Sequence, residues 1–167
     1  KASALLPLLL PDSPVIAWWP GAGPAHPSTD DIGVLASRRI TDAMGSEDPV
    51  AALVERACCL APGDTDLTWT RLTPWRALLA SALDRPRGTV LSGSVHADAH
   101  NAPGLLLAAW LRSRLGVDVT FDANAGPGIS QVTLTTDEGE VHVTRTDGKM
   151  ATFSAPDSPT LAVALRR

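Results

Sequence analysis

Apolar and polar residues follow two different rhythms along the chain, and the change comes near residue 117. Before it, short apolar or β-branched runs are separated by stretches in which apolar residues recur every three or four positions, as on one helix face. The short runs predict strands at 15–19 (VIAWW), 38–41 (RRIT) and 89–95 (TVLSGSV). This alternation is typical of an α/β fold with a mainly parallel central sheet, so we expect the three strands to share one sheet with flanking helices.

The helical stretches carry recognisable start and stop signals. In the stretch 46–62, Ser46 or Asp48 can cap the helix, and Pro49 occupies the first helical position, where its missing N–H costs nothing. The same kinds of signal predict further helical segments: the tail of a helix in 1–12, a helical start in 29–36, a helix from Pro74 with Thr73 as its cap, and a helix in 101–116 between Asn101 and Gly116.

Beyond residue 117 the chain alternates apolar and polar residues almost strictly, with the turn sequences DEG and TDG between the runs. Alternation of this kind with glycine-containing turns is typical of an antiparallel meander. We therefore predict two regions: an α/β domain at 1–116, and an antiparallel β extension at 117–167 that packs on the first region or continues its sheet.

Composition excludes several classes of partner. The 167 residues include 14 lysines and arginines against 18 acidic residues, with no run of four basic residues, so nucleic acid is an unexpected partner. The apolar runs are far shorter than the roughly 20 residues of a membrane span. Cys58 and Cys59 are adjacent in a helical pattern and poorly placed to bridge, which favours a reducing, cytoplasmic setting. Because the chain starts at Lys1 without a signal-peptide pattern, we expect it to be part of a longer protein.

One stretch, DLTWTRLTPWRALLASAL at 66–83, places Trp69, Arg71, Trp75 and Arg76 close to a predicted helix start. Positively charged side chains there face the positive end of the helix dipole, which destabilises the helix by about 0.5 kcal/mol for each of them. A negative group nearby should therefore compensate. One interpretation is an internal ion pair with Asp64, Asp66 or a nearby strand end. The other is a site for an anion or for a partner's carboxylate, since tryptophan and arginine are enriched at binding hot spots.

Other candidate sites for chemistry are weak. His96, Asp98 and His100 in the sequence HADAH would share one face of a strand and could converge on a divalent metal, although a solvated polar strand end is the simpler interpretation. The sequence SGSVH lacks the second glycine of a hydrolase elbow, and GAGP at 21–24 lacks the full dinucleotide fingerprint. We therefore expect no catalytic residue, no metal and no cofactor.

Several stretches in order along the chain resemble the glucose-6-phosphate dehydrogenase assembly protein (OpcA) family of actinobacteria and cyanobacteria. They are LLPLLLPDSPVIAWWPG, SRRITDA, DTDLTWTRLTPWRALLASALD, GLLLAAWLRSRLG and GPGISQVTLTTDEG. The resemblance covers nearly the whole chain and matches the later part of the family's length. It implies a non-catalytic protein that binds glucose-6-phosphate dehydrogenase and promotes its assembly or activity.

Two other functions stay open from the residues alone. A sensory module could bind a sugar phosphate or a similar anion at the TWTRLTPW helix start. A metal-dependent hydrolase could use the cluster of His96, Asp98 and His100.

Overall fold

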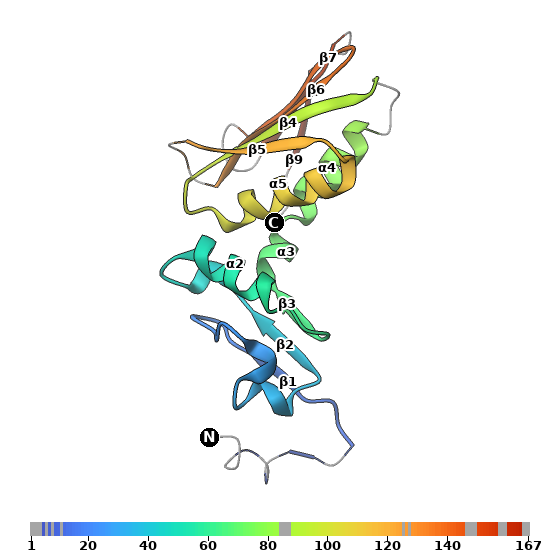
Figure 1. Cartoon of the computed structure of the whole chain (residues 1–167). Coiled ribbons are helices and arrows are strands. Elements are labelled where there is room, and N and C mark those ends of the chain that lie inside the picture. Colours follow the sequence, from blue (N-terminus) through green and yellow to red (C-terminus); the bar gives the residue numbers. More distant parts are fainter. Residues whose placement is uncertain are drawn as a thin grey trace. The chain divides into compact units, whose positions relative to one another are not determined.

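The computed structural model describes residues 12–83, 88–124, 128–145, 150–156 and 160–164, together with residues 5, 7, 9, 10 and 126. The helix tail predicted in 1–12 lies largely outside the described residues. The chain folds as two compact units, Lys1–Thr70 and Arg71–Arg167 (Figure 1). No helix within the described ranges is long and apolar enough to cross a bilayer.

The first unit contains a three-stranded sheet in the order β1-β2-β3. Its strands are β1 (Ile16–Trp18), β2 (Arg38–Thr41) and β3 (Asp64–Asp66), and both neighbouring pairs are parallel. These strands confirm the runs predicted at 15–19 and 38–41. The connections hold the short 3-10 helices η2 (Pro27–Thr29), η3 (Gly33–Leu35) and η4 (Ala43–Gly45), and the helix α2 (Pro49–Cys58).

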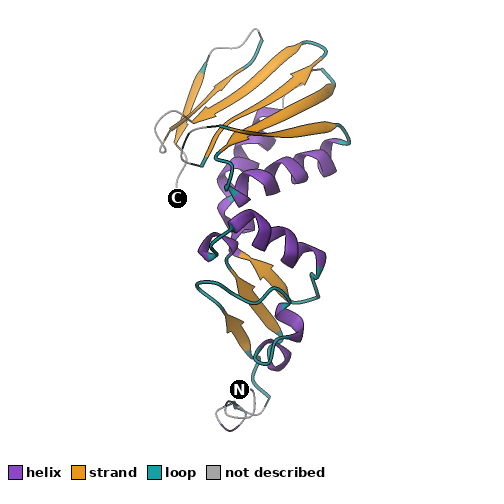
Figure 2. Cartoon of the chain, turned by 60° about the vertical axis from the view of Figure 1, so that its left-hand side comes forward, coloured by secondary structure: helices purple, strands orange, loops and turns teal. Residues whose placement is uncertain are grey.

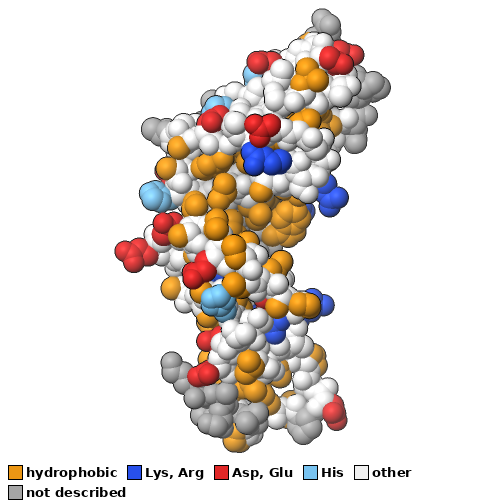
Figure 3. Space-filling view, in the orientation of Figure 1, with side chains coloured by type: hydrophobic (Ala, Val, Ile, Leu, Met, Phe, Trp, Pro, Cys, Tyr) orange, Lys and Arg blue, Asp and Glu red, His pale blue; other side chains and the backbone are white. Residues whose placement is uncertain are grey.

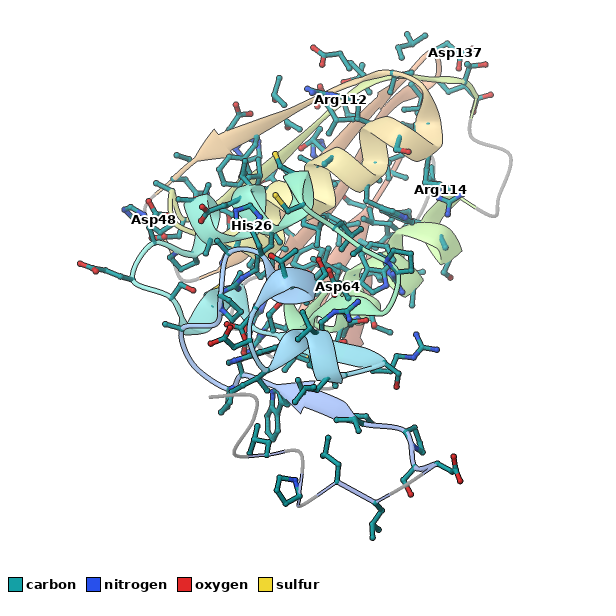
Figure 4. The ribbon with its side chains drawn as sticks, turned by 60° about the horizontal axis from the view of Figure 1, so that its bottom comes forward. His26, Asp48, Asp64, Arg112, Arg114 and Asp137 are labelled. Atoms are coloured by element: carbon teal, nitrogen blue, oxygen red, sulfur yellow. The ribbon has the colours of Figure 1, made fainter. Side chains whose placement is uncertain are left out.

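Helix α2 begins where the sequence predicts. Of the two possible caps the structure selects Asp48, whose carboxylate accepts hydrogen bonds from the backbone of Val50 and Ala51, and Pro49 is the first helical residue (Figure 4). The helical start predicted in 29–36 forms only the single turn η3. It is preceded by Asp30, which accepts hydrogen bonds from the backbone of Ile32 and Gly33.

The second unit contains a six-stranded sheet in the order β5-β4-β6-β7-β8-β9. Its elements in chain order are α4 (Thr73–Leu83), β4 (Val90–Ala97), α5 (Ala102–Leu115), β5 (Asp118–Ala123), β6 (Ile129–Thr136), β7 (Gly139–Arg145), β8 (Met150–Ser154) and β9 (Leu161–Ala164). Strands β6 to β9 form an antiparallel meander as predicted, and β4 also pairs antiparallel with β6. Strand β5, which was predicted to belong to the antiparallel region, does not. Among the described strand pairs of this sheet, only β4 and β5 are parallel, and α5 joins them.

The prediction that the first three apolar runs share one sheet is wrong. The run at 89–95 forms β4 of the six-stranded sheet, whereas the other two runs form β1 and β2 of the three-stranded sheet. A short apolar run indicates a strand but not the strands it pairs with, because pairing partners can lie far away in sequence. The boundary predicted between 116 and 117 falls inside the second unit, between α5 and β5, because β5 pairs with β4 along its whole length.

One face of the six-stranded sheet is covered by α4 and α5 (Figures 1 and 2). Helix α5 starts at the predicted cap Asn101, which accepts a hydrogen bond from the backbone of Gly104, and ends at Gly116 in the left-handed conformation. A Cβ at Gly104 would lie 2.8 Å from that of Ala97, so a glycine is required where this helix meets the sheet. The core between helices and sheet is mainly aliphatic, and its fully buried side chains include Leu72, Leu79, Leu107, Leu111, Val95, Val119, Val132, Leu134, Val141 and Val143.

Candidate functional site

The segment 66–83, singled out for its tryptophans and arginines, forms two helices in place of the one predicted. Helix α3 (Leu67–Arg71) follows β3 without a gap, and α4 begins at Thr73. Thr73 is therefore the first helical residue and not the cap, since the backbone of Arg76 already donates to the carbonyl of Leu72 at 2.9 Å. The start of α3 carries its own anion: the carboxylate of Asp66 accepts a hydrogen bond from the backbone N–H of Thr68.

The four candidate partner-binding residues differ in exposure. Trp69 is 40% exposed and Arg71 is also exposed, both on α3. Trp75 is only 4% exposed and belongs to the core of the second unit. Arg76 is half-buried, and its guanidinium carbon lies 6.0 Å from the centre of the Trp110 ring on α5, at the outer limit of a cation–π contact. Two of the four side chains are thus exposed, and two contribute to the packing around α4.

The acids proposed as internal partners, Asp64 and Asp66, are bound by two arginines for which the sequence had suggested no role. Arg39 on β2 forms an ion pair with Asp64, and Arg56 on α2 forms one with Asp66 at 3.2 Å. All four side chains are well shielded from solvent, with exposed fractions between 6% and 13%. Asp64 is among the side chains labelled in Figure 4.

Arg39 connects the segment before β2 with the segment before β3 through hydrogen bonds. Besides Asp64, its guanidinium donates to the carbonyls of Ala36 at 2.9 Å and Pro62 at 2.6 Å. Charge-assisted bonds to carbonyls stabilise an arginine that burial would otherwise penalise. Arg39 is thus a structural residue that joins two loops.

The carboxyl ends of β2 and β3 are occupied by a second cluster of polar groups. The carboxylate of Asp66 accepts hydrogen bonds from the Thr41 hydroxyl at 2.7 Å and from the backbone of Ala43 at 3.2 Å. Burial alone would raise the pKa of Asp66, but the bonds it accepts from Thr68, Thr41 and Ala43 outweigh burial and hold the pKa below its usual value. Asp66 is therefore an ionised carboxylate opposite Arg56.

In open parallel sheets, ligands bind in the crevice beyond the carboxyl ends of the strands. Here Arg56 fills part of that region, since it donates to the carbonyls of Gly23 at 3.1 Å and Pro24 at 3.3 Å. The GAGP loop thus turns two carbonyl oxygens toward an arginine. A phosphate cradle needs the opposite arrangement, with backbone N–H groups turned inward. The geometry supports the interpretation of GAGP as a plain loop.

The weaker alternative, a metal cluster of His96, Asp98 and His100, does not form in the structure. Strand β4 ends at Ala97, so Asp98 and His100 lie in the following turn, where the Asp98 carboxylate accepts a hydrogen bond from the backbone of His100 at 2.8 Å. Across the described part of the chain, no group of three or more histidine, cysteine or acidic side chains is arranged to hold a metal ion. The strand alternation assumed for HADAH fails because the strand ends after its first histidine.

His96 has other neighbours, which at first resemble a catalytic triad. Its Nε2 atom lies 3.0 Å from the Ser94 hydroxyl and 3.9 Å from a carboxylate oxygen of Asp122. In a triad, the histidine uses one ring nitrogen toward the serine and the other toward the acid, which lets the acid orient the base. Here the serine and the acid face the same nitrogen. The arrangement is a polar contact on a sheet face and lacks the geometry for proton transfer from Ser94.

Comparison with known proteins gives consistent matches along the chain. Two domains of a glucose-6-phosphate dehydrogenase subunit family match it: the C-terminal domain over residues 62–167, and the N-terminal domain over residues 1–58. A curated relative, the "Putative OxPP cycle protein OpcA" of Synechocystis sp. (strain ATCC 27184 / PCC 6803 / Kazusa), is 27% identical over 121 residues. That match covers 65% of this chain and 25% of the relative, so the chain spans about a quarter of the relative's length.

No solved structure matches the chain. The family assignment therefore depends on sequence. The C-terminal match alone extends over residues 62–167, well over half of the chain, and the N-terminal match precedes it in the expected order. The chain belongs to the OpcA family of glucose-6-phosphate dehydrogenase subunits.

Proposed function

We propose that this chain is a non-catalytic accessory protein that binds glucose-6-phosphate dehydrogenase and promotes its assembly or activity in the oxidative pentose phosphate cycle. The observation that carries the proposal is the pair of matches to the N-terminal and C-terminal domains of a dehydrogenase subunit family, in order and over nearly all residues. The name of the cyanobacterial relative points to the same cycle.

The chemistry of the described residues supports an accessory role. The ion pair of Arg56 and Asp66 occupies the region beyond the carboxyl ends of β2 and β3, where an open parallel sheet would bind a ligand. Ser94 and Asp122 share one nitrogen of His96, which leaves no oriented base. We also propose a cytoplasmic location, because Cys58 and Cys59 are free thiols, as is usual in a reducing compartment.

Among the four candidate partner-binding residues, we propose that Trp69 and Arg71 contact the dehydrogenase directly, since both are exposed. Trp75 and Arg76 act indirectly by holding α4 against α5, through the core and through the contact with Trp110. Exposed tryptophan and arginine side chains are the types that most often dominate the energy of a protein interface.

The test is calorimetric titration of the dehydrogenase with the unaltered chain and with Arg71→Met. The change should spare the melting temperature and weaken binding by about 1–3 kcal/mol, the scale of a lost charge-assisted hydrogen bond. Arg114→Met, at another exposed arginine near the end of α5, is the matched control and should leave the affinity unchanged.

Arg76→Met separates direct from indirect action. Because Arg76 packs over Trp110, its replacement should lower the melting temperature and leave the affinity of the folded protein almost intact. A normal melting temperature with weakened binding would instead place Arg76 on the partner surface. Absence of any binding by the unaltered chain, together with calorimetric binding of a sugar phosphate, would replace the accessory function with a sensory one.

A further inference from the structure

The sheet of the first unit has two unlike faces. Its register places Ala17 beside Arg39 and Asp64, and Trp18 beside Ile40 and Thr65. Because successive side chains of a strand point to opposite faces, these two rows belong to opposite sides of the sheet. The first row lies on what we call the covered face, and the second on the open face.

The covered face is closed by the chain itself. Ala17, Arg39 and Thr41 are buried there, and Arg56 reaches from α2 to Asp66 on the same side. The loops that join the strands contribute carbonyl groups to both buried arginines. This side of the sheet has its full set of partners within the first unit.

The open face consists of Ile16, Trp18, Arg38, Ile40 and Thr65. Ile16 and Trp18 are 60% and 61% exposed, Arg38 and Thr65 are also exposed, and Ile40 is partly buried. Hydrophobic side chains are visible at the surface of this unit in the lower part of Figure 3. Parallel sheets are found almost always with both faces covered, so an open face with an isoleucine and a tryptophan in solvent is out of keeping with the rest of the unit.

The dimensions of the open face fit one helix. Neighbouring strands lie about 4.8 Å apart, so the outer strands of a three-stranded sheet are about 10 Å apart, close to the diameter of an α-helix. A helix also suits a face that offers side chains and no backbone hydrogen-bonding groups. A strand would add to an edge of the sheet and leave this face open.

The positive charge of Arg38 indicates which charge a docked helix should carry. Arg38 stands in register with Ile16 at the end of the apolar row. Within the described residues, its guanidinium has no hydrogen bond or ion pair. A ligand that covers the face must leave Arg38 in water or provide a carboxylate, and the second arrangement gains a charge-assisted hydrogen bond. The complementary helix is therefore amphipathic, with apolar residues every three or four positions and an acidic residue at one end of that stripe.

We propose that the open face docks an amphipathic helix of glucose-6-phosphate dehydrogenase, with apolar side chains over Trp18 and Ile40 and a carboxylate at Arg38. The inference rests on the proposed function and specifies where the partner binds. An exposed tryptophan and an exposed arginine on one small apolar face are the residue types enriched in binding hot spots.

The experiment compares dehydrogenase binding by the unaltered chain with binding by Trp18→Thr and Arg38→Glu, with the melting temperature measured on the same preparations. Both positions are exposed, so neither change should lower the melting temperature. Each should weaken binding at least tenfold, and for Arg38→Glu the remaining affinity should no longer fall as salt is added. Leu60→Thr is the matched control, because Leu60 is 69% exposed and lies outside the open face, and it should change the affinity less than twofold.

Four outcomes would overturn the inference. If the unaltered chain binds the dehydrogenase and Trp18→Thr binds equally well, the docking site lies elsewhere and the proposed function stands. If the unaltered chain does not bind at all, the proposed function itself fails. If sedimentation shows a dimer of the chain that Trp18→Thr dissociates, the occupant is a second copy. If hydroxyl-radical footprinting shows Trp18 already shielded in a form of the protein as long as the cyanobacterial relative, the occupant is part of the same polypeptide.

Discussion

The two sheets of this protein leave one face open each, and the open faces differ in kind. In the six-stranded sheet, the face opposite α4 and α5 carries polar residues, among them Ser94, His96, Thr133 and His142. In the three-stranded sheet, the open face carries Ile16 and Trp18. A mainly antiparallel sheet can leave a polar face in contact with water, whereas a parallel sheet normally has both faces packed against other elements. Two exposed faces of the same protein thus differ in the chemistry of their side chains, and this difference is the basis for proposing the apolar face as the docking site.

The covered side of the second unit should be the most sensitive to change. Leu111 on α5 is 1% exposed and packs in the core between the helices and the sheet. Leu111→Ala removes buried methyl groups and leaves a cavity, so the free energy of unfolding should fall by about 3–4 kcal/mol. Urea denaturation followed by circular dichroism measures it. A loss below about 1 kcal/mol would show that the core collapses around the gap or is loosely packed.

The polar cluster on the covered side of the first unit should come next. Asp66→Asn keeps the size of the side chain and removes the charge opposite the buried Arg56, which should cost about 2–3 kcal/mol. The matched control is Asp118→Asn, since Asp118 forms an ion pair with Arg112 at 2.9 Å but both side chains are largely exposed. That change should cost less than about 1 kcal/mol.

The carboxylate of Asp66 also makes the stability of the folded protein depend on pH, in a direction that its lowered pKa fixes. Because the pKa of Asp66 is lowered in the folded state, its contribution to stability is complete above the ordinary aspartate pKa of 3.8 and is lost as the pH falls through the lower folded value. The melting temperature of the unaltered protein should therefore fall more steeply below about pH 4 than that of Asp66→Asn. Parallel curves for the two proteins would mean that Asp66 has the same pKa in both states.

The smallest effect is expected on the polar open face. His142 lies 3.2 Å from Glu140 and 3.2 Å from the Thr133 hydroxyl, and its side chain is 33% exposed. His142→Gln keeps a polar group in the row, so the free energy of unfolding should change by less than about 0.5 kcal/mol and dehydrogenase binding should not change. A clear loss of binding would make the polar face an interface and weaken the contrast with the apolar one.

The elements that the sequence predicted well are those with local signals. Asp48 and Pro49 mark the start of α2, and Asn101 and Gly116 mark both ends of α5, because capping depends on residues within one helical turn. Sheet membership could not be predicted in the same way. The alternating pattern of β5 is the same whether its neighbour is parallel or antiparallel, and the parallel pairing with β4 is visible only in the fold.

The buried arginines were missed for a related reason. Arg39 and Asp64 are 25 positions apart, and Arg56 and Gly23 are 33 apart, so no local pattern joins them. One signal was present. Adjacent residues of a strand point to opposite faces, so one of the two arginines in 38–41 had to point inward and needed an acid.

The pairing of β2 with β3 has a consequence for how this protein divides into modules. The two family domains meet between residues 58 and 62, but β3 at Asp64–Asp66 belongs to the sheet of the first unit. A cut or a gene fusion at the family boundary would remove the acids that neutralise Arg39 and Arg56 and would turn β2 into a new edge. The sheet of the first unit thus takes its third strand from the C-terminal family domain, so a junction that keeps this sheet and both ion pairs has to lie beyond Thr70, where the first unit ends.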